Sequence, residues 1–386
     1  MIPLAVPNLT GKEREYLNKC IDTTFVSSVG EFVTQIEEMM AAKTGTLYGV
    51  STSSGTTALH LALTGCGVGR DDLVIIPTFT FIATANAVAH CGAMPWLMDI
   101  SWDSWTLDAQ KLEKELSDHT IWDGKCLIHK ETGRRVAAVV PVYTLGNIPD
   151  MSKIRDIAQR YQLPIVADAA AAIGAEYKGK MSGELADLTV YSFNGNKTVT
   201  AGGGGMIVGN DKELMDKLKH LSTTARVTAE YDHNMVGFNY RMTNIQAAVG
   251  CAQLERAEEF VQKKRDIRQF YNQYFCNMKN CMLFPEPADV NSACWFSGIV
   301  LKQGGLEEVR SFCSKLREKG IEARSFWKPI HLQKPYENVV KAESLELASG
   351  LWSRILTLPC STNITMEELE YVASTLRELL NSEVEK

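Results

Sequence analysis

Short apolar runs without polar alternation recur through the first half of this chain. They are LVIIP (73–77), PWLMDI (95–100), VAAVVPV (136–142), PIVAD (164–168), LTVYSF (188–193) and GMIVG (205–209). Strands that are apolar on both faces are typical of a parallel sheet that helices cover on both sides. Helical patterns lie between the runs, for example at 150–161 and 211–221. The alternation predicts an α/β fold with a mostly parallel central sheet.

The pattern changes after about residue 250. A single long helix is expected at 243–265, followed by more helices and a few strands, one of them at 294–301. A chain of 386 residues is long enough for a large domain and a smaller partner. We therefore expect a large domain at 1–250 and a small C-terminal domain at 251–386.

Composition argues against several classes of protein. The formal net charge of -6 argues against nucleic acid as a main partner. No apolar run approaches the roughly 18 residues of a membrane-spanning helix, and the N-terminus lacks the pattern of a signal peptide. The ten cysteines are scattered without a CxxC pair, which favours free thiols in a reducing compartment and no metal site. We expect a cytoplasmic protein without a membrane partner.

Candidate ligand-binding residues follow the carboxyl ends of four predicted strands, which are the runs at 73–77, 164–168 and 188–193 and a short strand near 49–52. In chain order these are Ser54-Gly55-Thr56 at the start of a helix, Phe81, Asp168, and Lys197 in NGNKTVTAGGGG. In an open α/β sheet, ligands bind beyond the carboxyl ends of the strands. The four groups are therefore expected to lie around one ligand site.

Pyridoxal 5′-phosphate (PLP) would use each of these groups. Lys197 supplies an amine for an imine with the cofactor aldehyde, and Asp168 a carboxylate for the pyridine nitrogen. The helix start at Gly55 and Thr56 offers N–H groups to a phosphate, and Phe81 offers a ring face. Each residue also has a plainer interpretation, as a turn lysine, a helix cap, a capped helix start or a core aromatic. The residues by themselves leave both interpretations open.

The chain resembles the DegT/DnrJ/EryC1/StrS family of nucleotide-sugar aminotransferases from end to end. The matching segments are IPLAVPNL (2–9), SGTTAL (54–59), PTFTFIATANAV (77–88), ADAAAAIGA (167–175), YSFNGNKTVTAGGGGMIV (191–208) and GFNYRMTNIQAAVGCAQLE (237–255). TFVSSVGEFV (24–33) and the insertion ending in KETGRR look like the branch that aminates C4 of UDP-linked 4-keto-6-deoxy-N-acetylhexosamines, which feeds legionaminic acid or bacillosamine synthesis.

The resemblance implies both a fold and a reaction. The fold is the aspartate-aminotransferase-like fold type I of PLP enzymes, with a central seven-stranded sheet and a smaller C-terminal α+β domain. The protein is expected to be a homodimer with active sites shared at its interface. An amino group would pass from glutamate to the C4 ketone of the UDP-linked sugar through pyridoxamine phosphate.

The resemblance also assigns roles to the cofactor site. Lys197 matches the Schiff-base lysine, Asp168 the aspartate that pairs with the pyridine nitrogen, and Phe81 the aromatic over the ring. The residues that match phosphate ligands are Gly55, Thr56, Ser192 and, reaching the other subunit, Asn239.

At the sugar end, the resemblance implies contacts from Ser27, Tyr143 and His331. Two positions depart from the family pattern. Ala171 stands where the family usually has Glu or Gln near the cofactor's phenolic oxygen, and Tyr143 replaces a usual His. A tyrosine can still donate a hydrogen bond, although its pKa and reach differ from those of histidine.

Three alternatives remain. An aminotransferase specific for C3 of a dTDP-linked sugar would share the same motifs. A PLP sugar dehydratase of this fold has histidine in place of the lysine, so Lys197 argues against it. A PLP-binding regulator would need a DNA-binding module, for which neither end of the chain has spare length.

Overall fold

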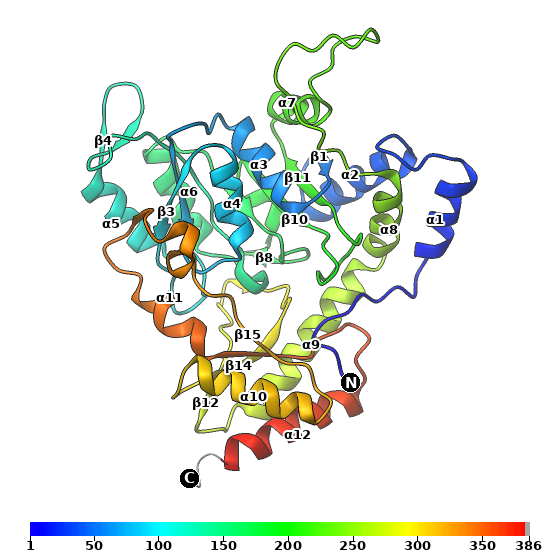
Figure 1. Cartoon of the computed structure of the whole chain (residues 1–386), viewed down its shortest axis with the longest axis vertical. Coiled ribbons are helices and arrows are strands. Elements are labelled where there is room, and N and C mark those ends of the chain that lie inside the picture. Colours follow the sequence, from blue (N-terminus) through cyan, green and yellow to red (C-terminus); the bar gives the residue numbers. More distant parts are fainter. Residues whose placement is uncertain (383–386) are drawn as a thin grey trace.

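The apolar runs of the sequence form neighbouring strands of one central sheet in the computed structural model, which describes residues 1–382 (Figure 1). The strand order is β1 (Tyr48–Thr52), β11 (Gly205–Gly209), β10 (Leu188–Ser192), β7 (Val166–Asp168), β6 (Val136–Val139), β2 (Leu73–Pro77), β3 (Met94–Met98) and the short β16 (Val340–Lys341). Parallel bridges at Val139–Ile165 and Val142–Asp168 join the two four-stranded halves. Only β11 runs antiparallel to its neighbours. The mostly parallel seven-stranded sheet is therefore confirmed, with β16 added at one edge.

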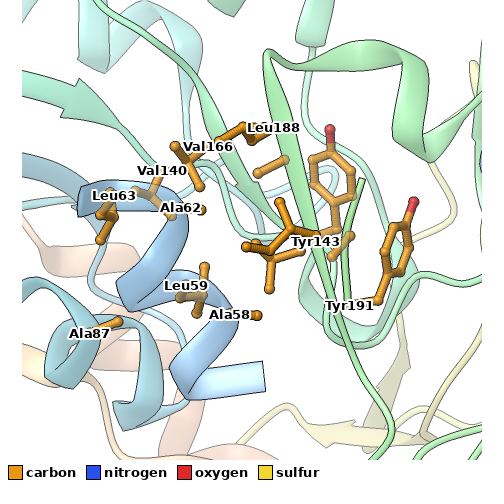
Figure 2. Close-up of a cluster of buried hydrophobic side chains, with 14 of the residues drawn as sticks. Ala58, Leu59, Ala62, Leu63, Ala87, Val140, Tyr143, Val166, Leu188 and Tyr191 are labelled. Atoms are coloured by element: carbon orange, nitrogen blue, oxygen red, sulfur yellow. The ribbon is translucent and has the colours of Figure 1, made fainter. Parts of the chain in front are cut away.

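Helices cover the sheet because each presents an apolar side to strands that are buried on both faces. These helices are α1 (Glu13–Asp22), α2 (Glu31–Thr44), α3 (Gly55–Gly65), α4 (Ile82–His90), α5 (Ala109–His119), α6 (Met151–Arg160), α7 (Lys212–Ser222) and α8 (Asn244–Leu254). Figure 2 shows α3 facing the strands, with Ala62 near Val140 and Val166. All three side chains are fully buried. Burying apolar surface in this way stabilises the fold by roughly 25 cal/mol per Å².

The prediction of a single helix at 243–265 is wrong, because the segment forms two helices. The first is α8, and α9 (Ala257–Phe275) starts after a break at Glu255 and Arg256. The first helix packs against α1 and α2 of the large part, whereas the second contacts β12 and β14 of the C-terminal part. The break redirects the chain between these two surfaces, and no Gly or Pro marks it in the sequence.

A second, antiparallel sheet forms the C-terminal part (Figure 1). Its order is β12 (Cys281–Leu283), β14 (Ser297–Leu301), β17 (Ile355–Leu358) and β15 (Arg324–Ser325), with α10 (Leu306–Glu318) and α12 (Met366–Ser382) alongside. This part has a hydrophobic core of its own, which includes Ile299, Phe312 and Leu356.

Two segments cross between the two parts. The N–H of Ile2 donates to the carbonyl of Gly320 (2.7 Å), so the N-terminal strand segment belongs to the C-terminal sheet region. In the other direction, β16 pairs with β3 of the central sheet. The boundary at residue 250 stays a prediction.

Smaller elements complete the fold. They are β4 (Thr120–Trp122) and β5 (Leu127–His129), β8 (Glu176–Tyr177), β9 (Lys180–Met181) and β13 (Val290–Asn291), the helix α11 (Glu346–Leu351), and short 3-10 turns. Within residues 1–382, no helix has the length and apolar character needed to cross a membrane.

Candidate active site

A cavity of about 320 Å³ opens beside the carboxyl ends of β7 and β10. Its walls bring together most of the residues that the sequence singled out. These are Gly55, Thr56, Phe81, Tyr143, Asp168, Ser192 and Lys197. The strand ends of the sheet therefore meet at one ligand-sized space.

Lys197 reaches this cavity from the loop after β10. A turn fixes the loop, because the N–H of Lys197 donates to the carbonyl of Asn194 (2.9 Å). Burial lowers the pKa of Lys197 to about 8, while the charge of Asp168 acts in the opposite direction. A lysine with this pKa is about one-tenth neutral at pH 7, far more than an ordinary lysine, and the neutral form is what a nucleophile or a general base requires.

Asp168 is buried at the end of β7. Its Oδ2 accepts a hydrogen bond from Oγ1 of Thr84 (2.7 Å), and its Oδ1 accepts one from the N–H of Ala170 (3.1 Å). Burial raises the pKa of Asp168, and these two hydrogen bonds lower it. A buried carboxylate that lines a cavity and has no ion pair within residues 1–382 suits a ligand with a positively charged N–H, such as a pyridinium.

The start of α3 suits the phosphate of a ligand. Ser54 caps this helix by accepting a hydrogen bond on Oγ from the N–H of Thr57 (3.1 Å). The N–H groups of Gly55 and Thr56 belong to the first turn, where a helix offers them no partner of its own. A Cβ atom on Gly55 would lie 2.9 Å from Cβ of Ser192, so only glycine fits between these elements.

Three aromatic rings form one wall of the cavity. Phe81 lies 5.6 Å from Trp327, and Trp327 lies 5.7 Å from Trp295, measured between ring centres. The sequence predicted Phe81 but missed both tryptophans. In the sequence, the only hint of the two tryptophans was a neighbouring phenylalanine, in CWF (294–296) and SFW (325–327). Both side chains come from the C-terminal part of the chain.

Tyr143 lines the cavity with a side chain that is almost fully buried. The hydroxyl oxygen is buried and has no hydrogen-bond partner within residues 1–382, and burial raises its pKa well above the usual value. The hydrogen bond from Tyr143 to substrate stays a prediction. Ala171 lies in the cavity wall, where its methyl group leaves open the space that a Glu or Gln would fill.

The other three predicted residues lie outside the cavity of this single chain. Ser27 and Asn239 are exposed, on segments that flank the body of the protein. Both ring nitrogens of His331 are hydrogen-bonded to hydroxyl groups of the protein. Nδ1 lies 2.7 Å from Oγ1 of Thr78, and Nε2 lies 2.9 Å from Oγ of Ser349. His331 therefore does not line the cavity, whereas Trp327, four residues earlier, does.

The sheet, the lysine and the buried carboxylate at neighbouring strand ends define a PLP enzyme of fold type I. Residues 7–377 match the DegT/DnrJ/EryC1/StrS aminotransferase family. A GDP-perosamine synthase from Caulobacter vibrioides is 38% identical over 98% of both chains. A UDP-4-amino-4,6-dideoxy-N-acetyl-β-L-altrosamine transaminase from Campylobacter jejuni is 28% identical, also over 98% of both.

A solved structure extends the likeness to three dimensions. A putative sugar aminotransferase from Streptococcus pneumoniae in its PLP form superposes with a TM-score of 0.89 at 25% identity, covering 99% of both chains. The chain belongs to the DegT/DnrJ/EryC1/StrS aminotransferase family. It is a nucleotide-sugar aminotransferase whose cofactor is PLP.

Proposed function

We propose that this aminotransferase moves an amino group from glutamate to the C4 ketone of a nucleotide-linked 4-keto-6-deoxyhexose. The observation that carries the proposal is the meeting of Lys197, Asp168 and the start of α3 around one cavity. An amine, a buried carboxylate and an anion site are the three groups that PLP transamination requires.

Each group then has a task. Gly55, Thr56 and Ser192 would hold the cofactor phosphate, and Asp168 would accept a hydrogen bond from the pyridine N–H. Phe81 would supply an aromatic contact to the ring. When bound, PLP supplies an aldehyde for imine formation and a ring that withdraws electrons from the reacting carbon.

Lys197 is the residue to which PLP attaches, and it also moves the proton. When free, its neutral amine would take the proton from the α-carbon of the amino donor and hold it for return in the same half-reaction. With a pKa of about 8, the amine accepts and releases a proton readily near neutral pH. In the second half-reaction, the same amine moves a proton to C4 of the sugar.

A homodimer completes the site in this proposal. The loop at 223–238 stands out from the large part beyond α7 (Figure 1). Its exposed apolar residues are Val227, Tyr231, Met235 and Val236. Pairing with a second copy would cover them and bring Asn239 toward the partner's phosphate site.

The nucleotide is proposed to be GDP. The GDP-perosamine synthase from Caulobacter vibrioides shares 38% of its residues with this chain, whereas the UDP-sugar transaminase shares 28%. A UDP-linked N-acetylhexosamine is the second candidate, favoured by the sequence at 24–33.

A substrate panel separates the candidates. The holoenzyme is incubated with glutamate and GDP-, UDP- or dTDP-linked 3-keto and 4-keto sugars, and products are read by mass. We expect amination of a GDP-linked 4-keto-6-deoxyhexose, and none by Lys197→Ala. Preference for a 3-keto sugar, or full turnover by Lys197→Ala, would contradict the proposal.

A further inference from the structure

Trp295 lies where the C-terminal part meets the lysine loop. Its indole Nε1–H donates to the carbonyl of Asn196 (2.8 Å), and the Nζ of the next residue, Lys197, lies 3.8 Å from the centre of its ring. One side chain therefore contacts both the loop and the amine that the loop carries.

The position of Trp295 is fixed from several sides. Its N–H donates to the carbonyl of Leu145 (3.0 Å), and its carbonyl accepts from Nζ of the buried Lys264 (3.0 Å). Its ring stacks on Phe296 at 4.1 Å, and it is only 2% exposed. The ring is thus held in place before Lys197 contacts it.

Within residues 1–382, the Lys197 amine has no ion pair and no hydrogen-bond acceptor, and the charge of Asp168, which raises its pKa, acts on it without a direct contact. The ring face carries negative electrostatic potential and attracts an ammonium without accepting its proton. A carboxylate in the same place would bind the charged form much more strongly. The tryptophan can therefore hold the amine in position while leaving its proton free to transfer.

We propose that Trp295 is a positioning residue for Lys197: its ring holds the free amine, and its indole N–H fixes the loop. The inference rests on the proposed role of Lys197 as the residue to which PLP attaches. Its effect belongs to the part of the cycle in which the lysine is released from the cofactor.

The test measures the pKa of Lys197 in the full-length, cofactor-free protein. Lysines are acetylated with limiting reagent across a pH series, and mass spectrometry follows the peptide that contains Lys197. In Trp295→Leu, loss of the ring removes a stabiliser of the ammonium, so the pKa should fall by about one. Trp295→Phe keeps an aromatic ring, so the pKa of Lys197 should fall less in this variant. An unchanged pKa in Trp295→Leu, or equal falls in both variants, would overturn the proposal.

A matched control accounts for the loss of a buried tryptophan. Trp105 is equally buried, at 2% exposure, and packs on Phe79 and Phe284. Trp105→Leu should leave the pKa of Lys197 unchanged. A fall equal to that in Trp295→Leu would show a general packing effect and overturn the proposal.

Fluorinated tryptophan gives a second measurement that preserves the shape of the side chain. Fluorine withdraws electrons from the ring face and weakens its attraction for a cation. All seven tryptophans of the chain are replaced, but within the described part only Trp295 holds the Lys197 amine over its ring. The pKa of Lys197 should fall stepwise with the number of fluorine atoms, and the absence of a trend would overturn the proposal.

Borohydride reduction of the PLP-loaded enzyme, followed by peptide mapping, tests the underlying assignment separately. Attachment of PLP to a lysine other than Lys197 would defeat the proposed function. The acetylation result would still report whether Trp295 affects the pKa of the Lys197 amine.

Discussion

Thr84 and Asp168 join helix α4 to strand β7 through a hydrogen bond of 2.7 Å from the threonine Oγ1 to the carboxylate Oδ2. Both side chains are buried. Because Asp168 lines the cavity, this bond fixes the direction of the carboxylate before any ligand arrives. The threonine therefore supports the residue proposed to hold the pyridine nitrogen.

Replacing Thr84 with valine removes the donor and keeps the shape. Hydrogen bonds to charged groups contribute about 1.5–3 kcal/mol, so we expect PLP affinity to fall by roughly ten- to a hundredfold. Titration of the cofactor-free enzyme with PLP measures this affinity. Thr189→Val is the matched control, since the Thr189 hydroxyl is buried without a partner in the described residues. A loss of affinity in both variants would remove the special role of Thr84.

Asp168→Asn should raise the stability of the cofactor-free protein and abolish its activity. Burial raises the pKa of this carboxyl in the folded state, so the folded state binds its proton more tightly than the unfolded state does. The folded protein therefore loses stability as pH rises through the unfolded value of about 3.9 and then through the raised folded value. In cofactor-free enzyme, Asp168→Asn should unfold at higher urea concentration than wild type at pH 7, with a gain that shrinks toward pH 4, while transamination is abolished. A gain independent of pH would contradict this account.

Gly55→Ala should close the phosphate end of the cavity. The new Cβ would lie 2.9 Å from Cβ and 3.2 Å from Oγ of Ser192, which requires one element to shift. Overpacking of this kind costs about 1–3 kcal/mol, and we expect weaker PLP binding together with a lower melting temperature. Gly69→Ala, where a Cβ meets nothing within 4 Å, should change neither quantity. PLP titration and thermal unfolding measure both effects.

The rate at which PLP attaches to the cofactor-free enzyme should rise with pH. With a pKa of about 8, Lys197 is mostly protonated at pH 7. The neutral fraction, and hence the attachment rate, should increase about tenfold from pH 7 to its plateau above pH 9. Stopped-flow absorbance follows the reaction. A flat profile would mean that the amine is already neutral at pH 7.

Glu37 should matter more to stability than its neighbour Glu38. Its buried carboxylate binds Arg241 at 2.5 Å and also accepts from the hydroxyl of Ser51 at 2.8 Å. Glu37→Ala leaves Arg241 largely buried and unpaired, which should cost about 3–5 kcal/mol in urea unfolding. The exposed Glu38 gives a control, and its alanine variant should stay within about 0.5 kcal/mol of wild type.

The sequence by itself determined the central sheet and the core of the candidate site. Continuous apolar runs identify strands buried on both faces, and Asp168 and Lys197 follow the ends of two such strands, whereas Gly55 follows the short strand β1. Parallel strands place their carboxyl ends together, so local pattern was enough to predict that these three residues meet.

Tertiary structure alone decided the rest of the wall. Trp295 and Trp327 come from the C-terminal part, and their direction depends on how that part packs against the large sheet. The same packing places the ring of His331 between Thr78 and Ser349. A local pattern predicts which face of a strand or helix is buried. It does not encode which distant element will cover that face. At this cavity, the packing of the C-terminal part against the large sheet places Trp295 beside Lys197.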